Sequence, residues 1–182
     1  MTTPKSGSVR TVYRSAGPPV LQVDLTDVTI AGEVQEWHTV TAQHGQPGAV
    51  VVALHNNRIL VGEHWRLTTG RRELEFPRGF GEPSEGAADT ASRELREETG
   101  LVAKSVAVLG TVFADTGLLT NPIHVVQAHV DRVDSEKVDR DPEFEDLYWL
   151  DAREVRSRIA DGSLRDAISL AAFALWQARQ AD

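Results

Sequence analysis

The chain has 182 residues, a length that suits one compact catalytic domain with a small added lobe, and it contains no cysteine, which excludes disulfides, thiol nucleophiles and cysteine–zinc sites. Its formal net charge of −8, from 19 Lys and Arg against 27 Asp and Glu, disfavours DNA or RNA as a partner, because positive surfaces hold nucleic acids. No apolar run approaches the roughly 20 residues that cross a bilayer and the amino terminus lacks an apolar signal segment, so we expect a cytoplasmic protein with no membrane partner.

Residues 1–45 are expected to form an amino-terminal antiparallel β lobe. Segments of strand character at residues 12–15, 21–30 and 34–42 are separated by stretches that contain Gly and Pro. A small lobe of this kind has little core of its own, so we expect a second copy of the chain to cover it. The remaining residues, 46–182, form the second predicted domain.

In this second domain, strands are mixed with helices. A near-continuous apolar run at residues 48–54 predicts a buried strand, and the segment after it predicts a hairpin partner. A loop rich in Gly and Pro leads to a helix that ends at Gly100, and two more strands, a short strand and two helices follow. The first of these two helices is expected to be capped by Asp151 and Glu154, and the second to begin at Ser163. The pattern predicts an α/β fold with a sheet between helices.

The helix before Gly100 carries a cluster of carboxylates. Glu94, Glu97 and Glu98 stand at positions i, i+3 and i+4, so they share one helix face and repel one another unless a cation lies near them. Hard divalent cations such as Mg²⁺ prefer carboxylate oxygens and bridge them to substrate phosphates. By itself, such a pattern is more often a solvated acidic helix face.

A longer motif surrounds these glutamates. The segment from Gly79 to Leu101 reads G-x5-E-x7-R-E-L-x-E-E-x-G-L, which matches the Nudix box at every constrained position. The chain therefore resembles the Nudix hydrolases. This resemblance implies a Nudix-type α/β/α sandwich with a mixed sheet, in addition to the amino-terminal antiparallel β lobe.

The flanking sequence is similar to the ADP-ribose pyrophosphatase branch of that family. That branch leads into the box with Glu-x-Pro-Ala-Gly, whereas residues 75–79 here read EFPRG, with Arg78 in place of alanine. The branch also carries a Ser-Pro-Gly loop, whereas residues 115–117 here read DTG. The resemblance implies hydrolysis of the diphosphate bond of a nucleoside diphosphate linked to another moiety, with ADP-ribose yielding AMP and ribose 5-phosphate. Nucleotide sugars, dinucleoside polyphosphates and nucleoside triphosphates are alternative substrates. A different functional class is also an alternative, namely a non-catalytic module that binds a nucleotide as a sensor.

The resemblance also implies the metal site. Glu94, Glu97 and Glu98 become ligands of Mg²⁺ or Mn²⁺, and the backbone carbonyl of Arg78 adds a further ligand. Metal bound by acids would neutralise and orient the diphosphate, which is the main requirement of this chemistry.

Further catalytic roles follow from the same resemblance. Arg93 is expected to orient the catalytic glutamates, Glu97 among them, by pairing with Glu85. The general base of the branch comes from a loop after the last long strand, where this chain offers Glu143 as the first choice and Glu145 as the second.

Substrate recognition is expected outside the box. Arg66, Arg72 and Arg78 lie just before or at its start, and arginines are suitable partners for phosphates, although some of them must be ordinary surface charges. Trp37 matches an aromatic residue that stacks on adenine in dimeric relatives, and its alternative is a half-buried strand residue. The resemblance implies a homodimer in which each lobe contributes to the neighbouring site.

Overall fold

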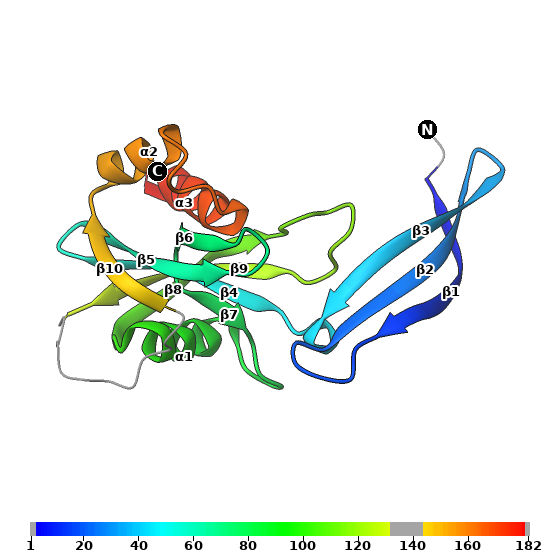
Figure 1. Ribbon diagram of the computed structural model, residues 1–182, viewed down its shortest axis with the longest axis horizontal. Helices are drawn as coiled ribbons and strands as arrows, with labels where there is room; N and C mark the ends of the chain where they lie inside the picture. The colour runs from blue at the N-terminus through cyan, green and yellow to red at the C-terminus, as the bar shows by residue number, and fades with distance from the viewer. Residues whose placement is uncertain (1–2, 132–143, 181–182) are drawn as a thin grey trace. The chain divides into compact units, whose positions relative to one another are not determined.

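The computed structural model describes residues 3–131 and 144–180, and the chain divides into two compact units (Figure 1). The first unit is built from Met1–Gln46 and Phe113–Pro122. The second unit is built from Pro47–Val112 and Ile123–Asp182.

The first unit contains a three-stranded antiparallel sheet, in the order β1 (Lys5–Arg14), β2 (Leu21–Ile30) and β3 (Glu33–Ala42), with a short 3₁₀ turn, η1 (Gln43–Gly45), after it. Ala31 and Gly32 join β2 to β3, and both have positive φ angles, of 52° and 92°. This is the two-residue hairpin geometry whose twist matches that of the flanking strands.

A loop from far along the sequence completes the first unit. The side-chain oxygen of Asn121 accepts the N–H of Ala42 at 2.8 Å, and its NH₂ group donates to the carbonyl oxygens of Ala42 and Gln46. Leu119 also forms a parallel bridge with Val40. Residues 113–122 are therefore bound to the end of β3 by backbone and side-chain hydrogen bonds.

The second unit contains a seven-stranded mixed sheet in the order β10-β5-β4-β9-β8, with β6 paired to β5 and β7 paired to β4. β4 and β9 run parallel, and the other pairs are antiparallel. The strands are β4 (Gly48–His55), β5 (Arg58–Arg66), β6 (Arg71–Glu75), β7 (Arg78–Phe80), β8 (Ala103–Val112), β9 (Ile123–Val130) and β10 (Phe144–Leu150).

Helices cover both faces of this sheet. Alternate residues of β4 point to opposite faces, because side chains alternate along a strand. Val50 and Val52 pack in a core with α2 (Ala152–Ala160) and α3 (Ala167–Gln180), whereas Val51 packs in a second core with α1 (Ala87–Thr99). Figure 1 shows α1 on one side of the sheet and α2 and α3 on the other. The predicted α/β/α sandwich with a mixed sheet is confirmed, and so is the additional antiparallel sheet.

The ends of the helices follow their capping residues. Gly100 adopts the left-handed conformation, with φ 75°, and its N–H bonds to the carbonyl oxygen of Arg96, so α1 ends where the sequence predicts. Asp151 and Glu154 form the predicted capping box of α2. The predicted start of α3 at Ser163 is wrong: the helix begins at Ala167, because Asp166 caps it by accepting the N–H of Ser169 at 2.8 Å. None of the helices in the described part of the chain is long and apolar enough to cross a membrane.

Candidate active site

Arg93 on α1 is the centre of a carboxylate cluster. Its guanidinium donates to both side-chain oxygens of Glu85 at 2.9 Å, to Glu94 at 2.7 Å and to Glu97 at 2.9 Å. It also donates to the carbonyl oxygen of Phe80 at 2.8 Å. One cation therefore fixes three carboxylates and the strand that leads into the helix, and the predicted pairing of Arg93 with Glu85 is present.

The ionisation of this cluster follows from those contacts. The hydrogen bonds from Arg93, together with the backbone N–H of Glu82, lower the pKa of Glu85 to about 2. In return, the hydrogen bonds to Glu85 raise the pKa of Arg93 above its already high value. Arg93 and Glu85 are thus a permanent ion pair at neutral pH.

Glu98 is in a different environment from its neighbours on α1. It is 6% exposed, and its Oε2 accepts the backbone N–H of Arg78 at 3.0 Å. Burial raises the pKa of Glu98 to about 8, and burial also raises the pKa of Glu94. Removing a carboxylate from water is costly unless a positive charge compensates it, so these two positions suit a bound cation.

The donor set on α1 fits a hard divalent cation, because it consists of carboxylate oxygens on one helix face. Within residues 3–131 and 144–180, no three His, Asp or Glu side chains converge into a ready ligand set. The reason lies in their present partners: Glu94 and Glu97 turn to Arg93, and Glu98 turns to the amide of Arg78. Glu97 is 58% exposed on its side chain, so it can change rotamer without disturbing the core.

Gly79 brings the backbone of β7 against α1. A Cβ atom at this position would lie inside the van der Waals radius of the Glu94 carboxylate. Any larger residue would push Glu94 away from Arg93 or displace β7. The glycine at the start of the motif is therefore required by close approach rather than by a turn.

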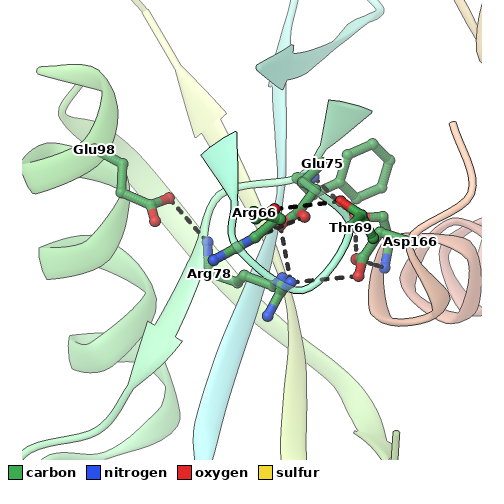
Figure 2. A network of polar contacts seen from close by, with 8 residues as sticks. Arg66, Thr69, Glu75, Arg78, Glu98 and Asp166 are labelled. Atoms are coloured by element: carbon green, nitrogen blue, oxygen red, sulfur yellow. Dashed lines mark hydrogen bonds and ion pairs between the residues drawn. The ribbon is translucent and has the colours of Figure 1, made fainter. Parts of the chain in front are cut away.

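A second polar network lies where the chain enters the motif, and Figure 2 shows it between α1 and the start of α3. The carboxylate of Glu75, which is 2% exposed, accepts hydrogen bonds from Arg66 and from Nη2 of Arg78. The same Nη2 donates to Asp166 at 3.3 Å. A cavity of about 300 Å³ borders this network, and its lining includes Arg66, Thr68, Thr69, Arg78, Arg165 and Asp166.

The remaining predicted site residues lie outside these two networks. Arg72 on β6 forms an ion pair of 2.6 Å with Glu145 on β10, and both side chains are partly exposed. Glu143 lies outside the described residues. Trp37 lies on β3 of the first unit, is 48% exposed, and donates its indole N–H to Gln35.

Sequence reasoning missed Asp166 and Glu75, which hold the lead-in to the motif. The signal for Asp166 was present, because Asp is a preferred N-cap residue, and its side chain accepts the N–H of Ser169, three residues later. Ser163 offered a competing start one turn earlier. Glu75 gave no signal for its burial, because nothing in the local sequence shows that two arginines enclose it.

The protein has a mixed sheet between two layers of helices. The helix α1, which follows a segment rich in glycine, carries a cluster of carboxylates beside this sheet. These two features define the class of α/β/α domains with an acidic helix packed on the sheet. A model of the NUDIX domain matches residues 44–173. The chain therefore belongs to the Nudix family, as the motif predicts.

Two relatives and one solved structure are informative. The chain is 29% identical over 142 residues to an ADP-sugar pyrophosphatase of Mus musculus, a match that covers 70% of this chain and 65% of that protein. It is 28% identical over 138 residues to an ADP-ribose pyrophosphatase of Bacillus subtilis, covering 74% of this chain and 75% of that protein. A crystal structure of an ADP compounds hydrolase superimposes with a TM-score of 0.80 at 19% identity, covering 97% and 94% of the two chains, and thus shares the fold.

Proposed function

We propose that the chain is a metal-dependent Nudix pyrophosphohydrolase that acts on ADP-ribose or a related ADP-sugar. The observation that carries this proposal is the acidic cluster of α1, in which Glu94 and Glu98 are buried and Arg93 holds Glu94 and Glu97 together. The names of the two relatives support the choice of substrate. Water attacks phosphorus, the bond between that phosphorus and the bridging oxygen breaks, and ADP-ribose gives AMP and ribose 5-phosphate.

In this proposal, Glu94, Glu97, Glu98 and the carbonyl of Arg78 hold Mg²⁺ or Mn²⁺. A cation held by these residues would supply positive charge that neutralises the diphosphate. Arg93 holds Glu94 and Glu97 in place through its hydrogen bonds to them, and Arg93 is itself fixed by its contact with Glu85.

The general base is assigned to Glu143, with Glu145 as the second choice. Glu145 is bound to Arg72 at 2.6 Å, which restricts its reach. If Glu143 is the base, E143Q lowers kcat about a hundred-fold or more with unchanged metal affinity, whereas E145Q stays near the wild type. The opposite ranking would transfer the role to Glu145.

Substrate binding is assigned to Arg66, Arg72, Arg78 and Trp37. Arg66 and Arg78 border a cavity of about 300 Å³, although both already bond to Glu75. Trp37 presents an exposed aromatic face that suits stacking on adenine, and in the proposed homodimer it would serve the active site of the partner chain.

A hydrolysis screen tests the proposal. ADP-ribose, nucleotide sugars, dinucleoside polyphosphates and nucleoside triphosphates are each incubated with the protein and Mg²⁺ or Mn²⁺. We expect the highest kcat/KM for ADP-ribose or another ADP-sugar. A preference for nucleoside triphosphates or dinucleoside polyphosphates would overturn the substrate, and tight binding of nucleotides without any turnover would favour the sensor.

A further inference from the structure

Asp166, the residue that caps α3, is connected to the carboxylate helix on the other side of the sheet. We infer that Asp166 is a positioning residue for the cation site: it acts through Arg78, whose peptide group contacts Glu98. This inference rests on the proposed function, because it concerns how the same site is held. The positions involved are drawn in Figure 2.

The first step is the fixation of Asp166 itself. One of its carboxylate oxygens accepts both the backbone N–H and the hydroxyl of Ser169, each at 2.8 Å. The other oxygen accepts Nη2 of Arg78 at 3.3 Å. The side chain of Asp166 is only 15% exposed and is bound by Ser169 and by Arg78. The orientation of the oxygen that accepts from Arg78 is therefore fixed.

The second step is the fixation of the segment that carries Arg78. The hydroxyl of Ser169, which is fully buried, accepts the N–H of Phe76 at 2.9 Å. The carbonyl oxygen of Pro77 accepts the N–H of Val51 at 2.8 Å. Residues 76 and 77 are thus held through their backbones, and Arg78 is held both by its strand pairing with Val50 and through its side chain by Glu75 and Asp166.

The third step is the transfer to the cation site. The N–H of Arg78 donates to Oε2 of Glu98 at 3.0 Å, and the next residue, Gly79, has no free space against Glu94. A displacement of this peptide by a few tenths of an ångström would therefore move both buried carboxylates. The carbonyl of Arg78, the further ligand assigned above, lies in the next peptide group and would move with it.

The connection depends on the arginine at position 78. The branch that the chain resembles has alanine where Arg78 stands, and an alanine side chain cannot reach Glu75 or Asp166. The guanidinium in this chain is bound by two internal carboxylates. Arg78 therefore links the capping residue of α3 to the backbone of the motif.

The test compares D166N with D161N. Asparagine keeps an acceptor for Ser169 but turns an NH₂ group, which cannot accept a hydrogen bond, to Arg78. Asp161 is the matched control, because it also accepts the N–H and hydroxyl of a serine, Ser163, and has no contact with the motif. Mn²⁺ binding to the substrate-free protein is measured by calorimetry, and kcat and KM are measured against Mg²⁺ concentration.

We expect D166N to weaken Mn²⁺ binding about ten-fold and to lower kcat about ten-fold, the size expected for the loss of one charge-assisted hydrogen bond. The KM for the nucleotide should change less than about two-fold. D161N should match the wild type. In the R78A background, D166N should have no further effect on Mn²⁺ binding, since Asp166 acts only through that side chain. Mn²⁺ affinity of D166N within two-fold of the wild type, or additive effects in the double variant, would overturn the inference.

Two controls separate this result from other failures. If D166N melts far below the wild type, Mn²⁺ binding by substrate-free R78A supplies the comparison, because R78A removes the link from its other end and leaves the cap of α3 intact. The kinetics of R78A are not used, since Arg78 is also assigned to substrate binding. If the wild type itself neither binds Mn²⁺ nor hydrolyses any substrate, the proposed function fails. If the wild type binds Mn²⁺ and turns over substrate, and D166N and R78A bind Mn²⁺ as tightly as the wild type, only the role of Asp166 is contradicted.

Discussion

The two sheets of this protein differ in how much of them is buried. In the first unit, Leu25 and Val28 are the buried apolar residues of the described strands, and both lie on the central strand β2. In the second unit, helices cover both faces of the sheet, and β4 is buried along almost its whole length. The second sheet can therefore hold buried charges in fixed positions, whereas the first presents side chains to its surroundings.

This difference in burial suits the two units to different functions. Buried carboxylates such as Glu94 and Glu98 keep their geometry because well-packed helices and strands support them on all sides. Exposed apolar residues of the first unit, among them Val9, Tyr13, Val34 and Trp37, suit recognition or association. Variants in the two units should therefore fail in different ways.

The largest effect is expected on α1. E98Q and E97Q should each lower kcat about a thousand-fold or more, because each removes a negative charge that is proposed to bind the cation at the reacting phosphate. E82Q is the matched control, since Glu82 is an exposed acid of the same motif region. Steady-state kinetics at saturating substrate measure the effect, and near-normal turnover in both variants would contradict the carboxylate–metal assignment.

The next effect is expected in the first unit and on KM rather than kcat. W37A should raise KM for adenine-containing substrates about ten-fold, the value of an aromatic stack. V34A is its control, because Val34 is 65% exposed and faces the other side of β3. Sedimentation of the wild type should show a dimer. A fully active monomer would exclude a shared site, and an unchanged KM would make Trp37 an ordinary strand residue.

The smallest effect is one of stability and depends on pH. Glu73 is 5% exposed, and hydrogen bonds from Arg165 and Arg71 hold its pKa well below its usual range. E73Q should destabilise the protein by about 1 kcal/mol at pH 7, a modest value because both arginines are half exposed.

The sign of this pH effect follows from the lowered pKa. The contribution of the ion pairs is complete above the ordinary carboxylate pKa of about 4.5. Below that pH the unfolded chain binds a proton at Glu73 while the folded protein does not, so the contribution falls as the pH is lowered toward the depressed pKa of the folded state. Denaturant unfolding at pH 7 and pH 3.5 should therefore show a smaller difference between E73Q and the wild type at the lower pH. An equal difference at both values would show that Glu73 acts by packing and not by charge.

Much of this architecture could be predicted from local patterns. The spacing of Glu94, Glu97 and Glu98 places them on one helix face, and Gly100 marks the helix end, because both rules involve residues within two turns. The link from Asp166 to Arg78 spans 88 positions and could not be predicted, since it depends on how α3 packs on the sheet. The attachment of Asn121 to Ala42 escaped prediction for the same reason.

Product analysis of ADP-ribose tests the central claim most directly. The protein is incubated with ADP-ribose with and without Mg²⁺, and the phosphorus-containing products are identified by ³¹P NMR. The account predicts AMP and ribose 5-phosphate in equal amounts, only when Mg²⁺ is present. Three results would contradict cation-dependent hydrolysis of the diphosphate bond at α1. They are the absence of cleavage, cleavage that persists in excess chelator, and the release of inorganic phosphate or ADP.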